Sequence, residues 1–184
     1  MQTTLDIPYS DTRNRVTVLV RIILVIPHLV VAYVLNIVAQ LATFAHWFIQ
    51  LITGARNEAI ADFVGKVLSY QARVVTYLGL MYDEYPGFFD DQGKTPVQIG
   101  LPPTDAPVNR LTVGLRFLWI IPAAIIAALI GIAIQVLTIV CWFAIVITGK
   151  MPQGMYDFLM KGHRYSLQVN AYGLLLTDTY PKYA

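Results

Sequence analysis

The chain has 184 residues, of which 57% are hydrophobic and 13% carry a charge, and its net charge is +2 at pH 7. Soluble globular domains average about 25% charged residues, so this composition, with a mean hydropathy of +0.58, excludes an ordinary soluble domain and indicates a membrane protein. The basic residues form no nucleic-acid-binding motif, and a single cysteine cannot form an intrachain disulfide.

The first long apolar stretch runs from Val16 to Thr53. As one straight helix it would reach more than about 50 Å, whereas the hydrocarbon core of a bilayer is about 30 Å thick. Pro27 divides the stretch, because proline suits a first helical turn and disfavours helical geometry in the residue before it. We therefore expect an interfacial helix over Arg13–Ile26 and a transmembrane helix from Pro27 to about Ile52.

A helical hairpin is the alternative for each long stretch, folding back near Asn36 in the first and near Gly131 in the second. Such a hairpin would enter and leave the membrane on one side and would be wedge-shaped. A single span is favoured, because a lipid-exposed turn at mid-membrane would leave backbone polar groups without hydrogen-bond partners.

Thr53-Gly54 is a helix-stop signal, and a mixed pattern follows over residues 57–82. Apolar residues recur there at spacings of three, four or seven, while charged residues fall largely elsewhere. The pattern predicts an amphipathic helix that lies in the membrane interface or packs back on the span.

Residues 90–107 are rich in Pro, Gly and Asp, a composition that favours extended or turn backbone over helix. We therefore place a linker there, between a first membrane unit at 1–89 and a second at 108–184.

The second unit repeats the first without a gap. Residues 15–86 align with residues 110–181 at a constant offset of 95, and roughly a third of the aligned positions are identical. The repeat predicts an interfacial helix from Asn109, a transmembrane helix from Pro122 and an amphipathic helix over 153–177. The expected fold is an all-α integral membrane protein of two tandem homologous units.

Lysine and arginine residues give no preferred orientation. With one crossing per unit, seven would lie on one side of the membrane and six on the other. This balance suits two copies related by an axis in the membrane plane, as inverted repeats are. The hairpin alternative explains it equally well, because all the charge would then lie on one side.

Two pairs of arginines are candidates for contact with lipid headgroups: Arg15, Arg21, Arg110 and Arg116. A guanidinium suits bidentate contact with a phosphate. The competing interpretation is snorkelling toward the interface or pairing within the chain.

Amides and hydroxyls lie near the middle of each expected span, at Asn36, Gln40, Thr43, Gln135 and Thr138. We expect them to form interhelical hydrogen bonds across the pseudo-twofold axis. The functional alternative is a polar path for an ion or a small solute, which would require oligomers because two spans cannot enclose a pore.

Aromatic residues suited to interfacial anchoring are Trp47, Trp142, Tyr77 and Tyr172. No metal site is expected, because His28 and His46 would lie about 27 Å apart along one helix and no histidine is repeated. The sequence offers no catalytic constellation or glycine-rich phosphate loop, so we expect neither a cofactor nor enzymatic activity.

Several motifs together resemble a known family. They are Arg15-x5-Arg21-x4-Ile26-Pro27-His28, Trp47-x5-Thr53-Gly54, Arg73-x3-Tyr77 and Asp83-x-Tyr85-Pro86. In this combination the chain resembles two tandem copies of the bacterial membrane-protein domain DUF4389, a domain of unknown function. The second copy departs from the pattern at Ala123 and Gln168, so neither position is expected to be needed in both halves. The resemblance implies an integral membrane location and offers no activity.

We therefore expect a non-enzymatic scaffold or accessory subunit of the bacterial inner membrane. Its expected partners are membrane lipids and either further copies of itself or a larger membrane complex, with no nucleic acid. The alternative is an oligomeric transporter or channel for small solutes or ions.

Overall fold

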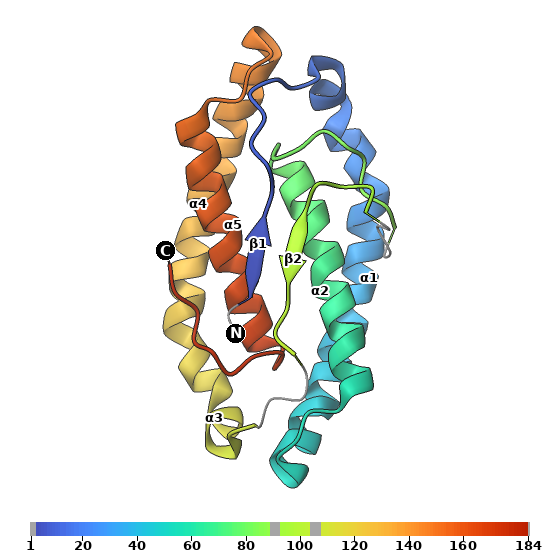
Figure 1. The fold of residues 1–184 in the computed structure, drawn as a ribbon, viewed down its shortest axis with the longest axis vertical. Helices are drawn as coiled ribbons and strands as arrows, with labels where there is room; N and C mark the ends of the chain where they lie inside the picture. Colours follow the sequence, from blue (N-terminus) through green and yellow to red (C-terminus); the bar gives the residue numbers. More distant parts are fainter. Residues whose placement is uncertain (1–2, 89–92, 104–107, 184) are drawn as a thin grey trace.

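The computed structural model describes residues 3–88, 93–103 and 108–183. The elements in chain order are β1 (Thr4–Asp6), α1 (Arg15–Thr53), α2 (Glu58–Leu78), β2 (Gln98–Gly100), α3 (Arg110–Gly114), α4 (Arg116–Thr148) and α5 (Gln153–Gly173). Each repeat is a hairpin in which a long apolar helix is followed by a shorter antiparallel one (Figure 1).

The first long stretch forms one unbroken helix, so both the predicted division at Pro27 and the alternative turn near Asn36 are wrong. Interior proline removes one helical hydrogen bond and strains the preceding turn. Contacts with α2 hold α1 on both sides of Pro27. Before the proline, Arg21 donates to the Tyr77 carbonyl at 2.8 Å, and after it His28 is hydrogen-bonded to the Tyr70 hydroxyl at 2.8 Å. The shorter helix thus supports the longer one past its proline.

The second long stretch is interrupted early, at Leu115 between α3 and α4. Gly114 precedes the break and disfavours helix by its backbone freedom. Helix α4 then continues through Pro122 and Gly131 without a turn. The predicted start of a transmembrane helix at Pro122 and the alternative hairpin turn near Gly131 are therefore both wrong.

Both long helices stop where the Thr-Gly signals predict. Gly54 has φ 73° and Gly149 has φ 75°, the left-handed conformation that glycine adopts without steric cost. The amphipathic helices also form, but α2 ends at Leu78 and α5 at Gly173, about one turn before their predicted ends.

A pseudo-twofold axis relates the two repeats, and α1 and α4 run antiparallel to each other. The Trp47 indole donates to the Val113 carbonyl at 3.0 Å, and its repeat equivalent Trp142 donates to the Val18 carbonyl at 3.1 Å. Helices α2 and α5 contact each other between the long helices. One repeat alone therefore does not complete the core.

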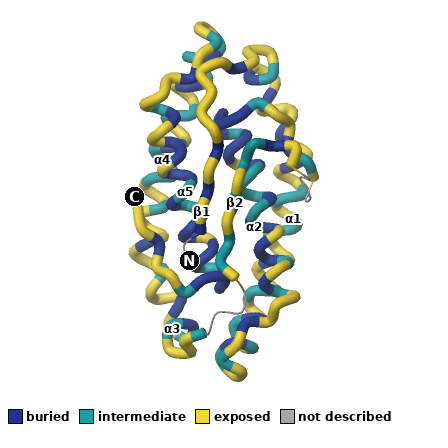
Figure 2. Tube along the Cα trace, viewed as in Figure 1, coloured by how far each residue is buried: buried dark blue, intermediate teal, exposed yellow. Residues whose placement is uncertain are grey.

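A short two-stranded ribbon, which the sequence did not predict, covers α2 and α5. Strand β2 lies in the described part of the linker and pairs antiparallel with β1, with Leu5 opposite Ile99. Figure 1 shows the ribbon in front of α5 and α2, with α4 and α1 toward the back and the outer edges. In Figure 2 the exposed residues follow α1 and α4, whereas buried residues gather where α2, α5 and β1 meet.

Candidate functional site

Arg21 forms a buried clamp within the first repeat. Only 1% of the residue is exposed. Its Nη1 donates to the carbonyls of Tyr77 and Tyr82, at 2.8 and 2.9 Å, and its Nη2 forms a 2.7 Å ion pair with Asp83. The guanidinium also stacks over the Tyr77 ring, 4.3 Å from its centroid. Arg21 therefore fixes the end of α2 and the loop after it to α1.

Arg116 repeats this clamp in the second unit. Its Nη1 donates to the carbonyls of Tyr172 and Thr177, its Nη2 pairs with Asp178, and its guanidinium lies 4.0 Å from the centroid of the Tyr172 ring. Asp178 is shared with Arg56, whose Nη2 lies 3.0 Å from the other carboxylate oxygen. Every partner of Arg116 in this clamp lies 95 residues after the corresponding partner of Arg21.

These positions favour pairing within the chain over lipid contact for Arg21 and Arg116. Tyr77 and Tyr172, which we expected at the lipid interface, are 1% and 4% exposed and lie under the two guanidinium groups. Burial raises the pKa of both phenols, and the neighbouring arginine opposes that rise.

Arg15 and Arg110, the other two predicted lipid contacts, are exposed at opposite ends of the molecule. Each lies beside the C-terminal cap of the other repeat's long helix: a Cβ added to Gly149 would come within 2.9 Å of Arg15 Nε, and one added to Gly54 within 2.8 Å of Arg110 Nε. A cation is favourable at a helix C-terminus. Their contact with lipid stays a prediction.

The polar residues expected between the long helices do not meet across the axis. The antiparallel register set by Trp47 and Trp142 places Gln40 near Ile120, about 22 Å along the helix from Gln135. Both glutamines are exposed, and among the described residues neither is hydrogen-bonded to the opposite helix; Asn36, Thr43 and Thr138 are half-buried and likewise form no such bond. Within one chain the two glutamines line no common path.

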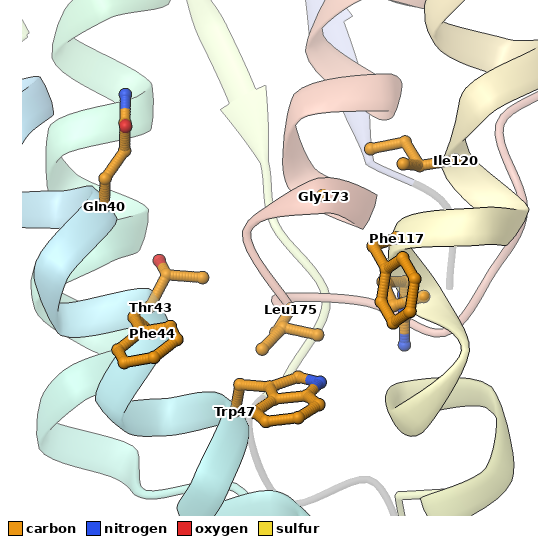
Figure 3. Close-up of a pocket in the computed structure, with 9 residues that line it drawn as sticks. Gln40, Thr43, Phe44, Trp47, Phe117, Ile120, Gly173 and Leu175 are labelled. Atoms are coloured by element: carbon orange, nitrogen blue, oxygen red, sulfur yellow. The ribbon is translucent and has the colours of Figure 1, made fainter.

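Two grooves lie instead between the long helices, one near each end. The first, of about 470 Å³, is lined on α1 by Gln40, Thr43, Phe44 and Trp47 and across from them by Phe117, Ile120 and Leu175 (Figure 3). The second, of about 370 Å³, is its repeat equivalent and is lined by Arg21, Leu80, Thr138 and Trp142 among others. The linings of both grooves are largely apolar.

Buried histidines serve the packing of the chain. His46 accepts a hydrogen bond from the Asn57 backbone at 3.0 Å, which joins the end of α1 to the start of α2. His163 of α5 lies in the interior, where burial lowers its pKa to about 4. Among the described residues no three His, Cys, Asp or Glu side chains are grouped as a metal site would require.

An apolar face covers the exposed sides of the two long helices. Its centre consists of two stripes in which residues recur every seven or eleven positions, the spacing of one helix face. These residues are between 53% and 77% exposed. They are Val16, Ile23, Val34, Leu41 and Ile52 on α1, and Leu111, Leu118, Leu129, Val136 and Ile147 on α3 and α4. Each member of the second stripe is the repeat equivalent of a member of the first, so both repeats present the same surface.

The profile of one family matches both repeats, at residues 15–90 and 110–184, and thus most of the chain. The chain belongs to the family described as domain of unknown function DUF4389. Two DUF4389 copies in tandem explain why the clamps, grooves and stripes occur in pairs. No curated protein matches this chain, and neither does any solved structure.

Sequence reasoning missed the acidic partners in the clamps. Asp83 and Asp178 lie in the loops after α2 and α5, and each follows its arginine by 62 residues in its own DUF4389 copy. That repeated separation was the available signal. Arg13 and Arg56, which donate to the carbonyls of Leu80 and Leu175, are not repeat equivalents, so the repeat could not reveal them.

Proposed function

We propose that this protein is a non-enzymatic scaffold of the bacterial inner membrane. Lipid covers its apolar face, and through that face the protein can pack with further copies of itself or with a larger membrane complex. The observation that carries the proposal is the pair of exposed apolar stripes, repeated in both halves. Surfaces of this extent on monomeric soluble proteins mark membrane or protein interaction sites.

The use of the buried polar groups supports a scaffold rather than an enzyme. Arg21 and Arg116 hold the chain together through carbonyls and a carboxylate in each repeat. Trp47 and Trp142 join the two repeats. Arg15 and Arg110 are two of the charged residues exposed at the ends, and their guanidinium groups suit anionic headgroups.

Flotation with lipid vesicles tests this proposal. The full chain, purified in detergent, is mixed with vesicles containing anionic lipid, and the detergent is removed. We expect the wild type to float with the vesicles and Leu41→Asp/Val136→Asp, which puts a charge into each stripe, to float at least tenfold less. Phe158→Asp is the matched control, because Phe158 is an exposed apolar residue on α5. A wild-type chain that remains soluble and monomeric without detergent would refute the proposal.

A further inference from the structure

We propose that α1 and α4 lie parallel to the membrane plane within one leaflet, and do not cross the bilayer. Their apolar face would contact acyl chains, while α2, α5, β1 and β2 would face water. This inference rests on the proposed function, because it requires that lipid covers the apolar face.

The length of the apolar face is the first argument. Val16 and Ile52, the ends of the α1 stripe, are 68% and 75% exposed. They are 36 residues apart in one unbroken helix, which corresponds to about 54 Å. A hydrocarbon core of about 30 Å would hold that length only at a tilt of about 55° from the membrane normal, whereas transmembrane helices tilt by about 0–40°. A helix lying in the plane immerses the whole stripe at one depth.

The position of exposed charges is the second argument. Asp62 and Lys66 form an ion pair on α2, with side chains 64% and 60% exposed. The contact of Tyr70 with His28 sets the register of the two helices, so Lys66, one turn earlier on antiparallel α2, lies level with the middle of the α1 stripe. In a perpendicular orientation this exposed pair would be at the centre of the bilayer, where charged side chains are rare and costly.

The second repeat makes the same argument independently. The Tyr165 hydroxyl donates to the Ala123 carbonyl, which places exposed Lys161, one turn before Tyr165, level with the middle of the α4 stripe. Helices α1 and α4 themselves contain no Asp, Glu, Lys or Arg residue between Arg21 and Thr53 or between Arg116 and Thr148. Apolar and charged surfaces are thus separated between layers of the molecule rather than along its length, as in interfacial proteins.

The basic residues at the two ends favour lipid as the occupant. Arg15 and Lys150 are exposed at one end, and Arg110 is exposed at the other. With the pseudo-twofold axis along the membrane normal, both ends reach the same headgroup layer, where cations are attracted to anionic lipid. This orientation also explains why counting basic residues on two sides of a membrane gave no preference.

Depth measurement distinguishes the two orientations. Single cysteines at Val16, Val34 and Ile52 are introduced into Cys141→Ala, which removes the native thiol, and are labelled with a fluorophore. The chains are reconstituted in vesicles whose lipids carry bromine at defined acyl positions. We expect the same quenching profile at all three sites. A Val34 site that is about 10 Å or more deeper than both ends would show that α1 spans the bilayer and would overturn the inference.

Accessibility of the charged layer provides the second measurement. Lys66→Cys and Lys161→Cys, in the same background, should both react with a membrane-impermeant maleimide, and from the same side of sealed vesicles. Protection of both sites, or labelling from opposite sides, would contradict the inference.

The outcomes separate this inference from the proposed function. Flotation together with a spanning depth profile would leave a membrane scaffold but refute the in-plane orientation. If the probes are not quenched by lipid and the chain is a dimer in solution, a second copy covers the face, and both proposals fail.

Discussion

At the scale of single residues, Arg21 and Arg116 each hold the fold of their own repeat together. A buried guanidinium is tolerated where hydrogen bonds and an opposite charge compensate its lost hydration, and Arg21 and Arg116 each have two carbonyls, a carboxylate and an aromatic ring. The polar end of each clamp lies in the loop after the amphipathic helix. Leu80 and Leu175 in these loops have φ values of 63° and 61°, a backbone conformation that residues other than glycine rarely adopt. The clamps hold these loops in place.

Removing one clamp should destabilise the fold without abolishing membrane binding. Arg21→Met keeps the apolar stem but leaves Asp83 without its ion-pair partner, and we expect a loss of about 3 kcal/mol in the free energy of unfolding. Thermal or denaturant unfolding in detergent measures this loss. Arg15→Met is the control, because Arg15 is exposed and should change stability by less than about 0.5 kcal/mol. Equal losses from the two substitutions would contradict the clamp.

His163 should make the fold sensitive to acid. Its pKa is about 4 in the folded chain and about 6.5 when unfolded, so between these values the unfolded state binds more protons and stability falls as the pH falls. The loss should begin near pH 6.5 and approach about 3 kcal/mol near pH 4. In His163→Leu, which installs the repeat equivalent Leu68, this part of the pH dependence should disappear from unfolding curves recorded at pH 8 and pH 5. An unchanged pH dependence would show that His163 is not its source.

At the scale of elements, tertiary contacts override local sequence signals. Pro27 and Pro122 both lie inside continuous helices, while the second long stretch is interrupted beside Gly114. The Tyr85 hydroxyl donates to the Leu24 carbonyl at 3.1 Å, within the turn that the proline disturbs. The helix ends, in contrast, follow local signals: Asn14, Asn57 and Asn109 cap the starts of α1, α2 and α3.

Substitution by alanine should have opposite effects on stability at a helix-cap glycine and at a glycine inside a helix. Gly54→Ala places a side chain at φ 73° and a Cβ within 2.8 Å of Arg110 Nε, so we expect a loss of about 1–2 kcal/mol. Gly131→Ala, in the interior of α4 with open space around its Cβ, should instead gain about 0.5–1 kcal/mol. Unfolding of both variants in detergent gives the comparison, and equal effects would argue against the assigned cap.

At the scale of the whole molecule, the N-terminal strand links the beginning of the chain to the second repeat. Arg164 of α5 donates to the Leu5 carbonyl at 3.1 Å and pairs with Asp6 at 2.8 Å, and the Tyr156 hydroxyl donates to the Ile7 carbonyl. Strand β1 therefore packs on α5 while pairing with β2, and the two repeats form one body through it as well as through Trp47 and Trp142.

Weakening this strand should affect both repeats together. Leu5 is 1% exposed, and Leu5→Ala should cost about 2–5 kcal/mol by leaving a cavity against α5. We expect one cooperative transition at lower temperature and faster amide exchange in both β1 and β2. Tyr9→Phe is the control, because Tyr9 is 39% exposed and loses only its bond to the Met151 carbonyl. Faster exchange in β1 alone would show that the ribbon does not join the repeats.

The amino-acid sequence by itself determined the duplication, the two apolar stretches, the amphipathic helices and the Thr-Gly stops. These features depend on composition, periodicity and local backbone preference, which each segment carries without its neighbours. The exposed apolar stripes follow from the same local patterns.

Only the tertiary structure decided that the prolines lie inside continuous helices, that Arg21 and Arg116 point inward, and that Gln40 and Gln135 do not meet. Each of these depends on residues distant in the chain: Tyr70 and Tyr77 hold α1 past Pro27, Asp83 and Asp178 pair with the arginines, and the antiparallel register separates the glutamines. The free energy of a buried charge or an interior proline is set by its partners in space, and a linear pattern does not contain them.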